Sequence, residues 1–211
     1  MKPEIEEVDV GDLIGAPFNP SDRLEEKALV DLKNSIDRYG VLSPIHIDAN
    51  NNIADGHRRV QCAKDLGIQK IPAIRLDIGV SDAWAELNGS TRPINRKQWG
   101  VAFSNGLPLD NVPSKIQYNL AKMKEILGDE FDIVIKQNSV YIYSIARQLS
   151  SYVYGCADYE FMKKAILWMY KHNQQAMIRE CMKNSIAADL IINAIENDLP
   201  IMRKFEIALH K

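Results

Sequence analysis

The sequence has few cysteines and no long apolar run. Its three cysteines, Cys62, Cys156 and Cys181, are far apart and lack the spacing of metal ligands. This argues against a disulfide framework or a zinc site, and for a reducing compartment. No apolar run approaches the length of a membrane-spanning helix, and the first residues are acidic where a secretory signal would be apolar. We therefore expect a cytoplasmic protein.

The sequence also lacks a strong excess of positive charge. Residues 1–80 hold 10 Lys and Arg against 14 Asp and Glu, and residues 81–211 hold 16 against 14. A protein whose affinity rests on many phosphate contacts along DNA usually has a clear basic excess. Bulk charge therefore does not indicate DNA binding, although Arg92, Arg96 and Lys97 form one candidate local patch.

Several well-known catalytic motifs are missing. There is no Gly-x-x-x-x-Gly-Lys-Ser/Thr phosphate loop, no Gly-x-Ser-x-Gly nucleophile elbow, no His-Glu-x-x-His metal helix and no Cys-x-x-Cys pair. These absences exclude the P-loop nucleotide hydrolases, the α/β-hydrolases and the zinc proteases of that type. Any phosphate chemistry must then use a different group of residues.

The segment best suited to phosphate is Asp55-Gly56-His57-Arg58-Arg59. It lies between the short apolar run Ile53-Ala54 and a helix-forming segment, residues 60–66. At a helix N-terminus the unpaired backbone N–H groups and the helix dipole both favour anions, and two arginines add positive charge. Arginine pairs at helix starts also form ordinary surface salt bridges, so the motif alone leaves both interpretations open.

A series of motifs in a fixed order places this segment in a wider context. The series is Val8-Asp9-Val10-Gly11-Asp12-Leu13, Phe18-Asn19-Pro20-Ser21-Asp22-Arg23, Leu29-Val30-Asp31-Leu32-Lys33-Asn34-Ser35-Ile36, Gly40-Val41-Leu42-Ser43-Pro44-Ile45, Ile53-Ala54-Asp55-Gly56-His57-Arg58-Arg59, Ala63-Lys64-Asp65-Leu66-Gly67 and Ile71-Pro72-Ala73-Ile74. It resembles the ParB-like N-terminal nucleotide-binding domain of the ParB/sulfiredoxin superfamily over about residues 8–77. A weaker block, Asp82 to Asn88 followed by Thr91-Arg92, extends the resemblance towards residue 97.

The chain departs from the family pattern at the phosphate-binding motif. ParB partition proteins usually have Gly-Glu-Arg-Arg where this chain has Gly56-His57-Arg58-Arg59, a change that bears on their CTP-dependent clamp chemistry. The Asp-Gly-His-x-Arg form is more similar to free-serine kinases of the same superfamily and to many plasmid and phage ParB-like proteins. Sulfiredoxins have a cysteine at the position of Gly56, so sulfinic-acid reduction is not expected. We expect the nearby Cys62 to pack in the core.

The resemblance implies a nucleotide site around this motif. Gly56 would let the backbone approach a polyphosphate, Arg58 and Arg59 would neutralise it, and His57 would bind phosphate, transfer a proton or simply cap the helix. The remaining nucleotide contacts are assigned by family position to Asn19, Pro20, Arg23, Ser43, Pro44, Asn88 and Arg92. Ordinary turn chemistry is an equally good explanation for Asn19-Pro20 and Ser43-Pro44.

Three residues are candidate catalytic groups if the chain is an enzyme: Asp55, His57 and Glu26. Asp55 is placed to bind Mg²⁺ or orient His57, or to be only a helix N-cap. Glu26 is the candidate general base by analogy with the serine kinases. Trp84 and Trp99 are expected to pack in a core rather than stack on a base.

The spacing of apolar residues predicts an α+β chain in two domains. Residues 1–80 are expected to form a small mixed-sheet ParB/sulfiredoxin-like domain that binds nucleotide, and residues 81–211 an all-helical domain that binds DNA or a protein. The segments predicted are a helix over 24–39, strands over 41–47, 52–54 and 71–76, and C-terminal helices over 113–127, 139–154, 159–172, 174–195 and 200–209. Residues 144–150 resemble a helix-turn-helix only weakly, because a glycine-containing turn and a polar recognition helix are not evident.

Two functions are compatible with these observations. In the first, the chain is a ParB-like, DNA-associated partition or regulatory factor of chromosomal, plasmid or phage origin. It binds CTP or ATP with Mg²⁺, its helical half converts nucleotide binding into binding of DNA or a protein, and the resemblance implies a homodimer. In the second, it is a phosphotransferase on a small molecule, similar to a free-serine kinase. The large helical region carries no evident chemistry and favours the first.

Overall fold

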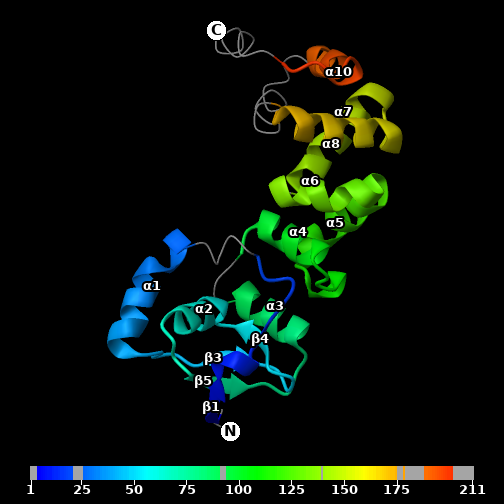
Figure 1. The fold of residues 1–211 in the computed structure, drawn as a ribbon. Coiled ribbons are helices and arrows are strands. Elements are labelled where there is room, and N and C mark those ends of the chain that lie inside the picture. Colours follow the sequence, from blue (N-terminus) through cyan, green and yellow to red (C-terminus); the bar gives the residue numbers. More distant parts are fainter. Residues whose placement is uncertain are drawn as a thin grey trace. The chain divides into compact units, whose positions relative to one another are not determined.

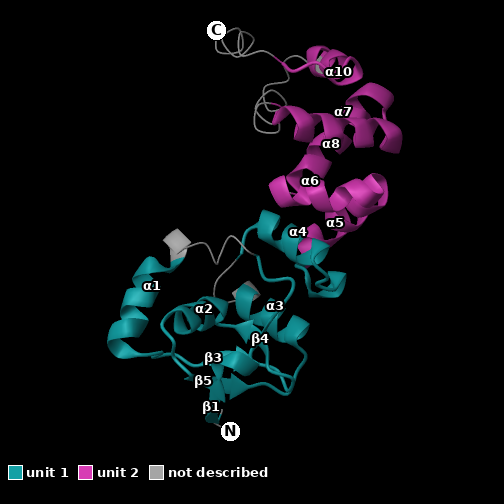
Figure 2. Ribbon diagram, viewed as in Figure 1, with its two compact units in different colours: residues 1–113 teal, residues 114–211 magenta. Residues whose placement is uncertain are grey.

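The structure, a computed structural model, describes residues 4–20, 26–90, 94–138, 140–174, 178 and 188–201. The chain divides into two compact units, residues 1–113 and residues 114–211 (Figure 2). From the sequence we placed the change to helical structure at residue 80. The first unit extends beyond that point because two helices after residue 80 pack within it, as described below.

The first unit is built on a five-stranded mixed sheet (Figure 1). Strand β1 (Ile5–Asp9) forms one edge and pairs antiparallel with β5 (Lys70–Arg75), which pairs parallel with β3 (Ile45–Ile47). Strand β3 pairs antiparallel with β4 (Asn52–Asp55), and β4 pairs parallel with the two-residue edge strand β2 (Ile14–Gly15). The mixed sheet confirms the predicted fold class, while β2 was missed because two residues carry no periodic signal.

The core of the sheet is aliphatic. Ile45 and Ile47 of β3 are completely buried, and the intervening His46 is half-buried, which is the alternation expected of a strand. They pack with Val60 and Ala63 of helix α2 (His57–Asp65), which lies against this sheet. Burying an isoleucine or valine side chain contributes about 1.5–3 kcal/mol, so α2 is anchored firmly and its first turn has a fixed position.

Helix α1 (Glu26–Tyr39) packs against α2. Leu29 and Ile36 of α1 meet Cys62 of α2 in a small buried cluster. Cys62 is completely buried, and its burial raises the pKa of the thiol above its usual value. The predicted packing role of Cys62 is thereby confirmed.

The connection from α1 to β3 is longer than the sequence suggested. Gly40 ends α1 in the left-handed region, with φ +71°, and its N–H donates to the carbonyl oxygen of Ile36 at 2.8 Å. The predicted strand over residues 41–47 is regular only from Ile45, because Pro44 lacks the N–H that a paired strand needs. Residues 41–44 therefore form an irregular corner.

Two helices extend the first unit beyond residue 80. Helix α3 (Val80–Ser90) packs against β4, and helix α4 (Arg96–Ser104) begins at a capping box made by Asn95 and Gln98. Trp84 of α3 is completely buried and packs edge to face with Phe18 at 5.4 Å and with Trp99 of α4 at 5.5 Å. The two tryptophans thus pack in a core, as predicted. Short 3-10 helices η1 (Val10–Asp12) and η3 (Leu109–Asn111) complete the unit.

The second unit is helical in its described part. Its elements are α5 (Ser114–Leu127), the 3-10 helix η4 (Gly128–Glu130), α6 (Phe131–Gln137), α7 (Tyr141–Tyr154), α8 (Tyr159–His172) and α10 (Ala188–Glu196). The sequence predicted α5, α7 and α8 closely but not the short α6. The predicted helix over 174–195 is described only at residues 174, 178 and 188–195, and of the one over 200–209 only residues 200 and 201 are described. No helix among the described residues is long and apolar enough to span a bilayer.

Candidate functional site

A cleft of about 560 Å³ in the first unit gathers most of the residues singled out from the sequence. Its wall includes Asn19, Ser43, Pro44, Asp55, Gly56, His57, Arg58, Arg59 and Asn88. Among the described residues, Pro20 is buried beside Asn19 and is not part of this wall. Arg23, Arg92 and the side chain of Glu26 lie outside the described residues. Segments far apart in the sequence thus meet at one place, the start of α2.

Gly56 is the N-cap of α2, and any side chain at this position would be strained. Its φ is +106°, a conformation that L side chains rarely adopt. A Cβ atom at this position would lie 2.4 Å from Cγ2 and 2.8 Å from Cβ of Ile45, which is completely buried in the sheet core. Because the N-cap is glycine, no N-cap side chain accepts the N–H groups of the first turn. The helix start is left open towards the cleft.

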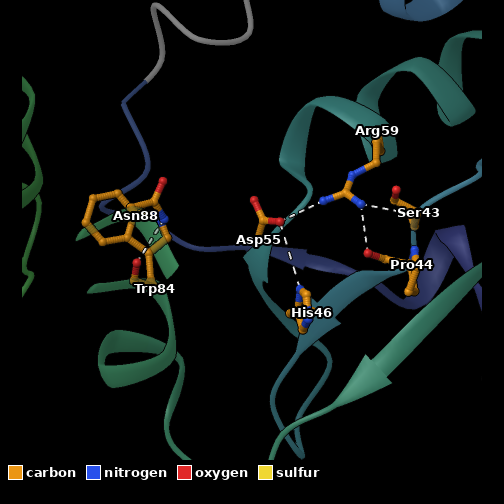
Figure 3. A network of polar contacts seen from close by, with 7 residues as sticks. All are labelled: Ser43, Pro44, His46, Asp55, Arg59, Trp84 and Asn88. Carbon is orange, nitrogen blue, oxygen red and sulfur yellow. Dashed lines mark hydrogen bonds and ion pairs between the residues drawn. The ribbon is translucent and has the colours of Figure 1, made fainter. Parts of the chain in front are cut away.

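Arg59 holds the corner before β3 in place (Figure 3). Its Nη1 donates to the carbonyl oxygens of Ser43 at 2.8 Å and Pro44 at 2.7 Å, and its Nη2 donates to Oδ2 of Asp55 at 2.7 Å. These charge-assisted bonds satisfy two carbonyls of an irregular segment and tie it to the end of β4. Arg59 therefore shapes the cleft wall, a role that the sequence did not reveal.

Asp55 is positioned by a β-bulge. Ile47 faces Ile53 across the two strands while His46 faces Asp55, so Ala54 is the additional residue on β4. His46 Nδ1 lies 3.9 Å from Oδ2 of Asp55, beyond hydrogen-bonding range but close enough for electrostatic attraction. The His46 ring, the Arg59 guanidinium and the Gly56 N–H together lower the pKa of Asp55 to about 2 against the opposing effect of its burial.

His46 is a cleft residue that sequence reasoning missed. No motif in the sequence pointed to it, but it lines the cleft and faces Asp55. The signal was available in principle, since it lies in the middle of one strand and Asp55 ends the next. In a regular antiparallel register without the bulge, however, His46 would pair with Ala54 and not with Asp55.

His57 is bonded to a distant segment. Its Nε2 accepts the backbone N–H of Ala16 at 3.2 Å, although the two residues are 41 positions apart. An imidazole nitrogen that accepts a hydrogen bond carries no proton, so the ring is neutral with its proton on Nδ1. The simple helix-cap explanation for His57 does not describe this contact.

The two asparagines of the cleft are linked through Trp84. Trp84 Nε1 donates to Oδ1 of Asn19 at 3.5 Å. Asn88 Nδ2 donates to the carbonyl oxygen of Trp84 at 2.8 Å (Figure 3). Asn88 is buried, with 4% of its surface exposed. On the α3 side, the cleft wall therefore has polar asparagine side chains next to the aromatic core around Trp84.

The charge of the cleft is slightly positive. Its charged lining residues are Asp55, Arg58 and Arg59, and the first and last of these form an ion pair at 2.7 Å. In the described part of the chain, no three His, Cys, Asp or Glu side chains are grouped as metal ligands. Protein groups alone do not build a metal site there, although oxygens of a bound polyphosphate would supply the missing ligands for Mg²⁺.

The second unit has a polar groove of about 360 Å³ between α5 and α7, lined by Asn119, Tyr143, Ser144, Arg147, Gln148 and Ser151. Arg147 and Gln148 are exposed, and Asn119 donates to the hydroxyl of Ser144 at 3.2 Å. Burial and the neighbouring Tyr118 phenol raise the pKa of Tyr143 to about 12, so this phenol stays protonated. The face of α7 is thus more polar than its sequence suggested.

Sequence comparison assigns the first part of the chain. Residues 1–84 match the ParB N-terminal domain. The chain is 33% identical over 73 residues to stage 0 sporulation protein J of Bacillus subtilis, and 32% identical over 74 residues to the probable chromosome-partitioning protein ParB of Campylobacter jejuni. These matches cover 33% and 34% of this chain but only 26% and 27% of the two relatives.

Similar solved structures are also ParB domains. A Pnob8-like ParB-N domain has 18% identity and a TM-score of 0.42, with 92% of this chain and 89% of that chain covered. The C-terminally truncated ParB from Caulobacter crescentus complexed with CTP-γ-S has 15% identity and a TM-score of 0.39, with 92% and 98% covered. Because these TM-scores are low, the assignment rests on the sequence match. Residues 1–84 of this chain are a ParB N-terminal domain.

Proposed function

We propose that the cleft binds the phosphates of a nucleoside triphosphate, CTP or ATP, together with Mg²⁺. The observation that carries this proposal is the start of α2, where a glycine N-cap and two arginines face one cleft. Backbone N–H groups, the helix dipole and cationic side chains all favour an anion at this point. A side chain at position 56 would collide with Ile45 in the sheet core, which explains why the N-cap is glycine.

The two arginines have different roles in this proposal. Arg59 forms the wall, since its guanidinium is bonded to two carbonyls and to Asp55. Arg58 lines the same cleft, and its positive charge is what gives the wall its cationic excess. We assign phosphate binding to Arg58 because it lies in the first turn of α2 and lines the cleft, and we assign contacts to sugar or base to Asn19, Ser43 and Asn88.

The alternative function, a small-molecule phosphotransferase, has less support. The lowered pKa of Asp55, about 2, makes this carboxylate a weak general base near neutral pH, which disfavours it in that role. The Nε2 of His57 is engaged by Ala16. Glu26, the other candidate base, has a side chain outside the described residues. Binding that regulates another activity therefore remains the proposal.

The regulated activity we propose is association with DNA, in a cytoplasmic homodimer that acts as a partition or regulatory factor. The face of α7 with Ser144, Arg147 and Gln148 supports this part of the proposal, because exposed Arg, Gln and Ser side chains on a helix suit contacts to phosphates and base edges. With a single arginine in the groove, its contribution to DNA affinity should be modest and only weakly dependent on salt, because salt dependence grows with the number of phosphates neutralised.

The test is a binding panel on the full chain. Equilibrium dialysis with CTP, ATP, GTP and UTP, with and without Mg²⁺, is repeated for Arg58→Ala and, as a matched control, for Arg38→Ala at the end of α1. We expect one nucleotide to bind and Arg58→Ala to weaken it about 10- to 100-fold, since a charge-assisted contact contributes about 1.5–3 kcal/mol. The Arg38→Ala variant should bind as the wild type does.

A second arm adds duplex DNA and follows both affinity and nucleotide consumption. Nucleotide affinity that rises with DNA supports the regulatory function. Consumption of nucleotide that requires free serine and ignores DNA would support the phosphotransferase instead. If none of the four nucleotides binds, or if Arg58→Ala binds as tightly as the wild type, the proposed site is wrong.

A further inference from the structure

His57 connects the phosphate-binding motif to the segment between β2 and α1. The N–H of Ala16 donates to His57 Nε2 at 3.2 Å. Ala16 is buried, and its carbonyl oxygen accepts the N–H of Asn19 at 3.1 Å, so residues 16–19 form one tight turn. Asn19 from this turn lines the cleft. The imidazole is thus bonded to the base of a turn that contributes to the cleft wall.

The same turn is held at its other end by α3. Phe18 packs edge to face on Trp84, and the Oδ1 atom of Asn19 accepts from Trp84 Nε1 at 3.5 Å. Trp84 in turn packs on Trp99 of α4. Residues 16–19 therefore connect the first turn of α2 with the aromatic core of α3 and α4.

We infer that His57 is a positioning residue: as a neutral imidazole it fixes the 16–19 turn through Nε2, and so links occupancy of the phosphate site to Trp84. The family resemblance assigned this position to phosphate binding or proton transfer. Proton transfer through Nε2 and acceptance of the Ala16 N–H at Nε2 are not compatible, because a protonated imidazole has no acceptor for that N–H. The observed contact decides for the neutral form.

Only the link between occupancy of the phosphate site and Trp84 rests on the proposed nucleotide site; the role of His57 in holding the 16–19 turn does not. A ligand that binds at the first turn of α2 acts directly on His57, because His57 is the first residue of that helix. Any shift of the ring is passed to Ala16 through a single bond and to Trp84 through two contacts. The turn is short and buried at both Ala16 and Phe18, so it has little room to absorb such a shift.

The first experiment examines the protein without ligand. In protein labelled with ¹⁵N-histidine, NMR should show the His57 ring as the neutral tautomer with its proton on Nδ1, and the Ala16 amide should exchange slowly with deuterium. His57→Gln keeps an acceptor at the end of a side chain of similar reach, whereas His57→Leu has none. We expect the Ala16 amide to stay protected in His57→Gln and to lose protection in His57→Leu. A ring protonated on Nε2, or equal protection in the two variants, overturns the inference.

The second experiment follows Trp84 by ¹⁹F NMR of 5-fluorotryptophan protein at saturating nucleotide, with CTP·Mg²⁺ and ATP·Mg²⁺ as probes. The Trp84 signal should move in wild type and in His57→Gln. In His57→Leu it should stay in place, even though nucleotide still binds about five- to tenfold more weakly, the loss expected for one hydrogen bond. An unchanged Trp84 response in His57→Leu overturns the link.

The two proposals fail in different ways. If dialysis finds no nucleotide bound to the wild type, the proposed function is wrong, while the tautomer and the amide exchange still decide whether His57 positions the turn. If nucleotide binds but the tautomer or the Leu variant behaves otherwise, only the inference about His57 fails. Should His57→Leu not fold, His57→Ser replaces it, because its hydroxyl is too short to reach Ala16.

Discussion

Two helices of this protein begin in opposite ways. Helix α8 begins at Asp158, whose Oδ1 accepts the N–H of Phe161 at 2.8 Å, with Glu160 in the first turn. Helix α2 begins at Gly56 in a left-handed conformation, without a side-chain cap, and its first turn has arginines but no acidic residue. The first arrangement stabilises a helix; the second puts positive charge at the positive end of the dipole.

The two helix starts suit different roles, helix stability in α8 and an open anion-favouring end in α2. At the start of α8 the Asp158 carboxylate accepts one of the first-turn N–H groups, and its negative charge disfavours a bound anion. With glycine as its N-cap, the start of α2 forgoes roughly a few tenths of a kcal/mol of capping energy and keeps a place where an anion is favoured. The stability that α2 lacks at its end comes from Val60 and Ala63, which are buried in the sheet core. Packing thus holds the open helix start in place.

The strongest test of this contrast is Gly56→Ala. The new methyl group would collide with Ile45, and the residue would keep an unfavourable positive φ. We expect a loss of about 3 kcal/mol in the free energy of unfolding, from overpacking plus left-handed strain. Urea unfolding followed by tryptophan fluorescence measures it.

The control lies at the other end of α2. Gly67 has φ +69°, but a Cβ atom added there would meet nothing within 4 Å, so Gly67→Ala tests the backbone strain alone and should cost about 1 kcal/mol. Equal losses for the two variants would show that the contact with Ile45 does not matter. Nucleotide affinity should fall only in Gly56→Ala.

A smaller effect is expected from removing the cap of α8. Asp158→Ala should lower the free energy of unfolding of the second unit by about 1 kcal/mol, because the N–H of Phe161 loses its acceptor. Asp158→Asn keeps an acceptor and should cost much less. Thermal unfolding followed through Trp168 reports on this unit. A change in nucleotide affinity in either variant would break the contrast between the two helix starts.

The smallest effect concerns acid stability at the cleft. The pKa of Asp55 is lowered from 3.8 to about 2, so the ionised carboxylate stabilises the fold above about pH 4, and this contribution is lost as pH falls towards 2. Asp55→Asn should therefore be less stable than wild type at pH 6, with the gap closing below pH 4. Because 38% of the Asp55 side chain is exposed, about 1 kcal/mol or less is expected. Urea unfolding of both proteins at a series of pH values measures this difference. A difference in the free energy of unfolding that stays constant with pH would show that the pKa of Asp55 is not lowered.

The sequence was sufficient to locate the cleft that we propose as the site, but not the bonding within it. The motif from Asp55 to Arg59 is local, and helix-start chemistry made its position predictable. That Asn19, Ser43 and Asn88 share its cleft followed from the family pattern alone, because no local signal brings such distant segments together. The α1, α5, α7 and α8 helices were predictable because their apolar residues recur at helical spacing.

What the sequence did not reveal are contacts set by tertiary geometry. The bulge at Ala54 decides that His46 faces Asp55, and a bulge has no sequence signature here. The bonds of Arg59 to the Ser43 and Pro44 carbonyls depend on the irregular corner before β3, which no local pattern predicts. The bond from Ala16 to His57 joins residues 41 positions apart and needs the folded sheet to exist.

The corner at residues 41–44 has a practical consequence for anyone who modifies this protein. Leu42 is 77% exposed, and such a stretch would ordinarily be chosen for inserting an epitope tag or a protease site. Its next two carbonyls, however, are the acceptors of Arg59 Nη1. Lengthening or cutting the chain there would release the guanidinium and, with it, one wall of the cleft.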